Sequence, residues 1–139
     1  MALVVPDAGE LELLNKMLKA ALSSDEDYIL RLFKSDITLG SSTVAADLNA
    51  IEADFTDYEE KTLTRAGWGA AATSSGKAQS VYSAEQSWTC GASGNTIFGY
   101  YILGDISGVL LWAEKFSSTR ILVDETVLNL TPVFTLSSE

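Results

Sequence analysis

The stretch TIFGYYILGDISGVLLWAEKF, residues 96–116, decides the fold because it has the pattern of a β-hairpin. Two runs rich in aromatic and β-branched residues flank a five-residue loop, 104–108, that begins and ends with glycine. Strict alternation gives each run two apolar faces: Ile97, Tyr101 and Leu103 against Phe98, Tyr100 and Ile102, then Val109 and Leu111 against Leu110, Trp112 and Phe116. A hairpin that is apolar on both faces must be covered on both sides, by its own chain or by a partner.

An amphipathic helix is predicted over residues 8–22. Its apolar residues recur at spacings of three and four: Leu11, Leu14, Met17, Leu18, Ala21 and Leu22. Asp7 and Glu10 have the spacing of a capping box at its start. A helix of this length is marginal alone in water, so its apolar stripe must dock on something. Two possibilities stay open, an open end of its own β-domain or a neighbouring subunit.

The other strands are predicted from short apolar or alternating runs. They fall at 28–34, 61–65, 81–82, 85–90 and 126–136, and the small polar residues 70–80 are predicted to form a loop. Pro132 is expected at an edge, a bulge or an unpaired position. Strands that follow strands without intervening helices exclude a βαβ design. They favour a mainly β chain, an antiparallel β-sandwich (jelly-roll-like) with one N-terminal amphipathic helix. We divide it into a helix or arm over 1–26 and a single β-sandwich domain over 27–139.

The candidate interface follows from the covers that the hairpin needs. We expect the strands at 126–136 and 28–34 to form the layer facing one side, and the helix at 8–22 to cover the other, from its own chain or from another. The residues predicted to contribute to a subunit contact are Leu11, Leu14, Met17, Leu18, Tyr100, Tyr101 and Trp112.

Charge and composition narrow the partners and the compartment. The formal net charge is −10, and residues 1–60 carry 13 acidic against 4 basic side chains. A surface this acidic repels phosphate backbones, so direct nucleic-acid binding is not expected. No run is long and apolar enough to span a membrane, and the N-terminus lacks the basic region of a secretory signal. A single cysteine, Cys90, fits synthesis in a cytoplasm.

Catalytic and metal-binding motifs are not found in the sequence. The chain contains no histidine, which removes the commonest general base and zinc ligand. Cys90 lies beside Trp88 in a predicted strand and is interpreted as a buried apolar residue. Six acidic residues between 47 and 60 could suggest calcium, but their spacing matches no known loop, and a solvated acidic surface is favoured. We therefore predict no enzyme, no metal and no cofactor.

Aromatic residues offer a different class of function. Trp and Tyr faces line sugar-binding grooves in lectin-like sandwiches, but they are also common in cores and interfaces. The residues considered for such a groove are Trp68, Trp88, Trp112, Tyr82, Tyr100 and Tyr101.

Four segments carry a resemblance to a known family. They are MALVVPDAGELELL (1–14), EADFTDYEEKTLT (52–64), GYYILGDISGVLLWAEKF (99–116) and LNLTPVFTLSS (128–138). Together they resemble the capsid decoration, or cement, proteins of tailed bacteriophages. The resemblance implies a β-sandwich or jelly-roll protomer, often a homotrimer, that binds the major capsid protein on the outer surface of the virion and ties capsomers together. It brings no catalytic residues with it. A tail, baseplate or fibre component and a carbohydrate-binding sandwich for host attachment remain the alternatives.

Overall fold

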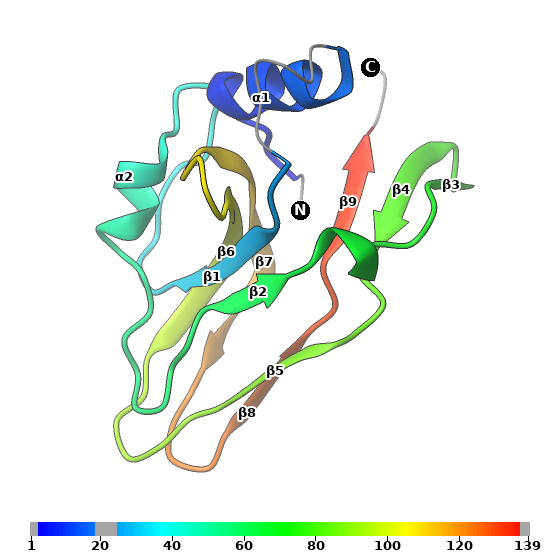
Figure 1. The fold of residues 1–139 in the computed structure, drawn as a ribbon. Helices are drawn as coiled ribbons and strands as arrows, with labels where there is room; N and C mark the ends of the chain where they lie inside the picture. Colours follow the sequence, from blue (N-terminus) through cyan, green and yellow to red (C-terminus); the bar gives the residue numbers. More distant parts are fainter. Residues whose placement is uncertain (1–2, 19–24, 137–139) are drawn as a thin grey trace.

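The computed structural model describes residues 3–18 and 25–136. It is a mainly β protein with antiparallel sheets (Figure 1). In chain order the elements are α1 (Asp7–Leu18), β1 (Tyr28–Phe33), α2 (Ala45–Asn49), β2 (Lys61–Leu63), the 3₁₀ helix η2 (Arg65–Gly67), β3 (Ala72–Ser74), β4 (Lys77–Val81), β5 (Gln86–Thr89), β6 (Thr96–Gly104), β7 (Leu110–Ile121), β8 (Val127–Leu130) and β9 (Val133–Leu136).

The predicted hairpin is confirmed as the antiparallel pair β6 and β7. It belongs to a four-stranded sheet with the order β2-β1-β6-β7, which places β6 at the centre. Val4 extends the sheet beyond β7, because its N–H and C=O both bond to Ala113 over 2.9 Å. The strand predicted at 28–34 is therefore a neighbour of the hairpin within one sheet, and the expectation that it lies in the facing layer was wrong.

A β-bulge near the loop changes the faces that strict alternation predicted. Ile102 pairs with Trp112 and Leu103 pairs with Leu110, which leaves Leu111 as the extra residue on β7. Leu111 and Trp112 consequently pack into the same core cluster, whereas alternation had placed them on opposite faces. The bulge thus turns two large neighbouring side chains toward one side of the sheet.

A second irregularity lies between Ile97 and Gly99 of β6. Ile97 packs in the same cluster as Tyr100, and Phe98 packs against the cluster that contains Tyr101. Alternation had predicted the reverse for both residues. A sequence pattern of period two cannot show where a register shift occurs, so this error is the expected kind.

Both faces of the hairpin are covered by the chain itself. On one face, Trp88 of β5, Leu128 of β8 and Phe134 of β9 pack in or against the larger core cluster. On the other face, Leu48 of α2 and the neighbouring Ile51 pack on β6 and β7. The C-terminal strands were correctly expected as one cover. Among the described residues, the second cover is the segment around α2 (Figure 1). The helix at 8–22 had been expected to provide this cover.

The pairing of the later strands is nested around the hairpin. β6 pairs with β7, β5 with β8 and β4 with β9, all antiparallel. Backbone hydrogen bonds bridge the gaps between these pairs, including Leu122 N–H to the Asn95 carbonyl at 2.8 Å and Tyr82 N–H to the Pro132 carbonyl at 2.9 Å. Strands β4 to β9 therefore form a long two-stranded ribbon. Its β6–β7 part belongs to the four-stranded sheet, and the rest of the ribbon folds back over that sheet.

The segment predicted as the loop 70–80 contains a small hairpin instead. β3 pairs with β4, and Ser74 lies opposite Lys77 across a two-residue turn. Ser75 and Gly76 both have positive φ, 51° and 76°, as a type I′ turn requires. The strands were missed because most of their residues are exposed and none is buried, so no apolar alternation marks them.

Pro132 interrupts the strand predicted at 126–136. The structure divides this segment into β8 and β9, which pair with different partners. Pro132 lies between them, buried, at the point where the chain passes from one sheet to the other. A proline has no N–H for a ladder, so it suits this unpaired position.

Helix α1 begins at Asp7, and its described part ends at Leu18. Residues 19–22 of the predicted helix lie outside the described residues. The Glu10 amide bonds to the Pro6 carbonyl at 2.9 Å, so the helix is capped at Pro6, one residue before the predicted cap, and Asp7 is inside the first turn. Gly9 is buried, and a Cβ there would lie 2.7 Å from the carbonyl oxygen of Leu110, so the helix rests directly on β7.

Replacing Gly9 with alanine tests this contact. Alanine usually stabilises a helix by about 1 kcal/mol relative to glycine. Here we expect the free energy of unfolding to fall by about 2 kcal/mol, because the methyl group meets the β7 backbone. Chemical denaturation measures the difference, with Ala8→Gly on the exposed side of the same turn as the control. A more stable Gly9→Ala protein would show that α1 does not rest on β7.

Candidate functional site: a groove beneath helix α1

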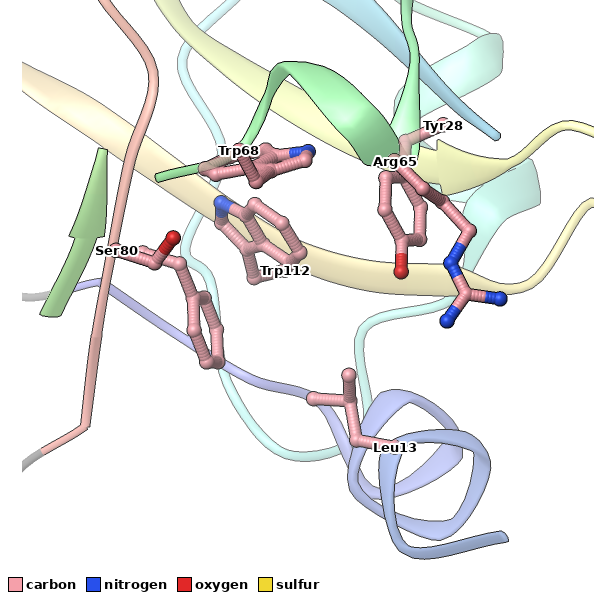
Figure 2. Close-up of a pocket in the computed structure, with 7 residues that line it drawn as sticks. Leu13, Tyr28, Arg65, Trp68, Ser80 and Trp112 are labelled. Carbon is pink, nitrogen blue, oxygen red and sulfur yellow. The ribbon is translucent and has the colours of Figure 1, made fainter. Parts of the chain in front are cut away.

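A groove lies between α1 and the strands beneath it. It consists of two adjoining cavities of about 550 Å³ and about 190 Å³, which share Leu13, Tyr28, Arg65 and Phe134 in their walls. Val5 and Leu136 line the larger cavity, and Trp68, Ser80 and Trp112 line the smaller one (Figure 2). We call it the helix-end groove. Its walls are mainly apolar, so it suits an apolar group.

Four aromatic rings form the floor of the groove. Trp112 is central: its ring centroid lies 5.7 Å from that of Trp68 and 4.5 Å from that of Phe134. Tyr28 packs against Trp68 at 6.3 Å with its ring almost perpendicular. Trp68 contacts Trp112 edge to face, with 69° between the ring planes, and Figure 2 shows Arg65 and Leu13 on the other side of the cavity. The bulge at Leu111 makes this arrangement possible, because it turns Trp112 toward the cluster.

Two polar atoms in this floor are not satisfied. The indole Nε1 atoms of Trp68 and Trp112 are buried, and no group among the described residues meets hydrogen-bond geometry with either of them. An unpaired buried donor typically costs about 1–3 kcal/mol. The floor of the groove is therefore less well satisfied than the rest of the core.

A buried carboxylate ties one rim of the groove to the hairpin loop. Glu26 accepts hydrogen bonds from Ile106 N at 2.6 Å, Ser107 N at 2.7 Å and Ser107 Oγ at 2.8 Å. Lys16 of α1 donates to the same carboxylate at 3.0 Å. Burial alone would raise the pKa of Glu26, but the Ser107, Lys16 and Ile106 donors together hold it below its ordinary value. Sequence reasoning missed Glu26, because a lone Glu in a polar segment gives no signal of burial.

The other rim is organised by Arg65. Its guanidinium forms an ion pair with Asp25, and its backbone N–H donates to the Asp27 carboxylate at 2.8 Å. Hydrogen bonding to Asp25 raises the pKa of Arg65. The polar segment before β1 thus anchors η2, which holds Trp68 over the floor.

The structure separates the predicted interface residues. Tyr100, Tyr101 and Trp112 are buried in the two core clusters of the chain itself. Tyr100 and Tyr101 are therefore not surface contact residues, and that prediction is corrected: both hairpin faces are already covered by α2 and by the strands β5, β8 and β9. Trp112 is reached only through the helix-end groove, whose floor it helps to form. Leu11 is 64% exposed and remains a candidate. The side chains of Leu14, Met17 and Leu18 lie outside the described part of the chain.

Hydrogen bonds explain why the buried tyrosines are tolerated. The Tyr100 hydroxyl donates to Glu114 at 2.8 Å, and the Tyr101 hydroxyl donates to Asn49 at 2.9 Å. Burial raises the pKa of both phenols far above the ordinary value, so they stay neutral. Each ring supplies apolar area to the core while its hydroxyl is satisfied at the edge.

Cys90 is buried in the core, and three of the acidic residues in the segment 47–60 form ion pairs with Arg31 or Lys34. Burial, with the nearby carboxylates of Asp124 and Asp57, raises the pKa of the Cys90 thiol, which makes it a poorer nucleophile. In the acidic segment 47–60, Glu52 and Glu60 pair with Arg31 and Asp54 pairs with Lys34. No group of metal-ligating side chains occurs among the residues that the structure describes.

The tryptophans considered for sugar binding pack against other groups of the chain itself. Trp88 is buried, its Nε1 donates to the Glu59 carbonyl at 2.7 Å, and Lys61 lies over its ring at 5.5 Å. Trp68 and Trp112 pack against other rings, and Tyr82 is buried beneath Trp68 at 5.4 Å. Trp88, Trp112 and Tyr82 therefore present little open face on which a sugar could stack, whereas Trp68 is half-buried at the groove.

A second exposed apolar surface was also missed. Ile121, Val123 and Val127 are among the most exposed large apolar residues described, and they lie at the end of the molecule remote from α1 (Figure 1). The apolar run Ile121-Leu122-Val123 was the available signal, but it was not among the elements predicted from the sequence. Within the described ranges, no helix is long and apolar enough to cross a membrane.

Among the described residues, the fold and these surfaces define a mainly β protein with antiparallel sheets, a groove with an aromatic floor, and exposed apolar residues between β7 and β8. A scan against protein-family models found no match, and a search of curated proteins also found none.

Proposed function

We propose that this chain is a capsid decoration (cement) protein, which binds the outer surface of a phage head and stabilises contacts between capsomers. The observation that carries the proposal is the pair of exposed apolar surfaces at opposite ends of one β framework. The helix end presents Leu11 and the groove, and the far end presents Ile121, Val123 and Val127. A protein that ties neighbours together needs contacts at more than one end, and the resemblance in four segments supports the same role.

The proposed architecture is a jelly-roll-like β-sandwich. In a jelly roll, a two-stranded antiparallel ribbon folds over so that its strand pairs lie in two facing layers. The nested pairs β6–β7, β5–β8 and β4–β9 form such a ribbon. The larger core cluster includes side chains from the four-stranded sheet and from β5 and β8, which supports two facing layers.

The proposed partners are the major capsid protein and further copies of the chain, with a homotrimer as the expected oligomer. The helix-end groove is the proposed self-contact because it is apolar, and Leu11 is exposed on the same helix. The net charge of −10 supports a role on an outer surface, since it disfavours direct nucleic-acid binding and keeps decorated particles apart. The protein would be made in the host cytoplasm and carried on the assembled virion.

Adding the purified protein to heads that lack it tests the proposal. We expect saturable binding to the heads and greater resistance of the decorated particles to heat and to chelator. Sedimentation of heads with bound protein measures the first, and release of packaged DNA measures the second. Heads that bind none of the protein would contradict a decoration role. Labelling of intact virions separates this role from that of a tail, baseplate or fibre component. The label lies on the head for a decoration protein and on the tail for the alternatives.

A further inference from the structure

Three aliphatic side chains project outward where the β7 end of the ribbon turns into β8. Ile121 is 70% exposed, Val123 58% and Val127 52%, whereas their neighbours Leu122 and Leu128 are buried in the core. We call the three exposed residues the bend patch. Thr96 pairs with Ile121 and Thr89 pairs with Val127, so two threonines lie beside the patch. All three belong to one short segment, 121–127, and exposed aliphatic residues concentrated in one segment are typical of a protein contact.

The backbone beneath the bend patch is held by hydrogen bonds from three loops. Thr126 N–H donates to the Val123 carbonyl at 2.9 Å, and Glu125 N–H donates to the Cys90 carbonyl at 2.9 Å. Gly91 N–H donates in turn to the Thr56 carbonyl at 2.9 Å, which joins the 54–57 loop to the other two. A surface held in this way loses little conformational freedom when a partner binds.

Carboxylates surround this end of the molecule. Asp124 and Glu125 stand between Val123 and Val127 in the turn, and both are exposed. Asp57 is also exposed and lies close to Gly91, since a Cβ on Gly91 would be 2.6 Å from its carboxylate oxygen. Arg120 is the basic residue next to the patch. The surroundings of the patch are therefore acidic.

We infer that the bend patch is a docking surface for a different protein, one whose contact surface presents aliphatic side chains flanked by Lys or Arg. A second copy of this chain placed on the patch by a two-fold axis would bring Asp124 and Glu125 against their own equivalents, which repels. Nucleic acids and anionic membranes are disfavoured by the same charge. The inference rests on the proposed function, in which this partner is the capsid shell.

Binding of a triple variant to heads lacking this protein tests the inference. Ile121→Ser, Val123→Ser and Val127→Ser together should weaken binding at least about 100-fold, because each truncated contact residue contributes roughly fivefold. Val44→Ser, Val81→Ser and Ile106→Ser remove three exposed aliphatic residues elsewhere, and this control should bind as the wild type does. Circular dichroism and the melting temperature show whether each variant folds.

A second variant keeps the inference testable if the triple variant fails to fold. Asp57→Asn, Asp124→Asn and Glu125→Gln remove the nearby charge without removing any apolar contact. Asparagine at 57 tolerates the positive φ of 70° found there. Binding of this variant should be weaker than that of the wild type at low salt, and the difference should shrink at high salt.

The outcomes separate the inference from the proposed function. If the wild type does not bind heads, the decoration role fails. If the wild type binds and both variants bind equally well, the decoration role stands and the bend patch is not the docking surface. If light scattering shows that the triple variant has lost an oligomer that the wild type forms, the patch is a self-contact and the inference is overturned. Loss of head binding with the oligomer unchanged supports it.

Discussion

Glu26→Gln is expected to lower the free energy of unfolding by about 3 kcal/mol, since breaking a buried charged pair costs about this much. Four donors converge on the two oxygens of this fully buried carboxylate. A glutamine keeps one oxygen and places an NH₂ group against two of those donors. If the remaining oxygen faces Ile106 and Ser107, the NH₂ group meets the Lys16 ammonium. The hairpin loop and α1 therefore lose their common anchor.

The pH dependence of the free energy of unfolding follows from the direction in which folding shifts the pKa of Glu26. The pKa of Glu26 is lower in the folded protein than its ordinary value of 4.5, so the folded state favours the charged form. The stabilisation is complete above pH 4.5 and is lost as the pH falls through the folded pKa. In Glu26→Gln this group no longer titrates. The variant should consequently lose less stability between neutral and acidic pH than the wild type does.

Urea denaturation at a series of pH values measures both effects. Asp36→Asn is the matched control, because Asp36 also pairs with a lysine, Lys115, but its side chain is 71% exposed. It should change the free energy of unfolding much less than Glu26→Gln does. Equal, small losses in the two variants would show that the Glu26 carboxylate is not a buried anchor.

Gly94→Ala is the second substitution with a large expected effect. A Cβ at residue 94 would overlap the carbonyl oxygen of Leu122 and lie 2.6 Å from its carbonyl carbon. Both obstacles are backbone atoms, held where Leu122 N–H bonds to the Asn95 carbonyl, so they cannot move aside as a side-chain tip could. We expect the free energy of unfolding to fall by about 3 kcal/mol, at the upper end of ordinary overpacking effects.

Gly40→Ala is the control for this experiment. Nothing lies within 4 Å of the Cβ position at residue 40, and its backbone is outside the left-handed region. Alanine there should leave stability unchanged or raise it by up to about 1 kcal/mol, because it restricts the unfolded chain. The midpoint of thermal unfolding compares the two variants. A Gly94→Ala protein as stable as Gly40→Ala would contradict the close crossing at the bend of the ribbon.

The strands and the central hairpin were predictable because they are rich in apolar and β-branched residues. The residues 28–33, 86–89, 96–104 and 110–121 were all recognised, at least in part, as strands. The polar hairpin β3–β4 was not, although Ser75-Gly76 was a usable turn signal. Most of its side chains are exposed, so the sequence shows no alternation of apolar and polar residues there.

The candidate site was predictable only in part. Trp68 and Trp112 were recognised as notable aromatic residues, but their contact depends on a bulge that no periodicity shows. Tyr100 and Tyr101 were expected at an interface because the second cover of the hairpin could not be found in the sequence. That cover is α2 and its flanking loop, which fold over β6 from residues far away in the chain.

Sequence alone determined that this protein is mainly β, that a hairpin at 96–116 is its centre and that both hairpin faces are buried. These properties depend on the local composition and on the periodicity of apolar residues, and both can be seen in neighbouring residues of the sequence. Only the tertiary structure decided which segment covers each face, which of two neighbouring side chains enters the core and where the exposed aliphatic residues gather. Those outcomes depend on register shifts and on contacts between distant segments, and a single residue of shift moves a side chain to the opposite face.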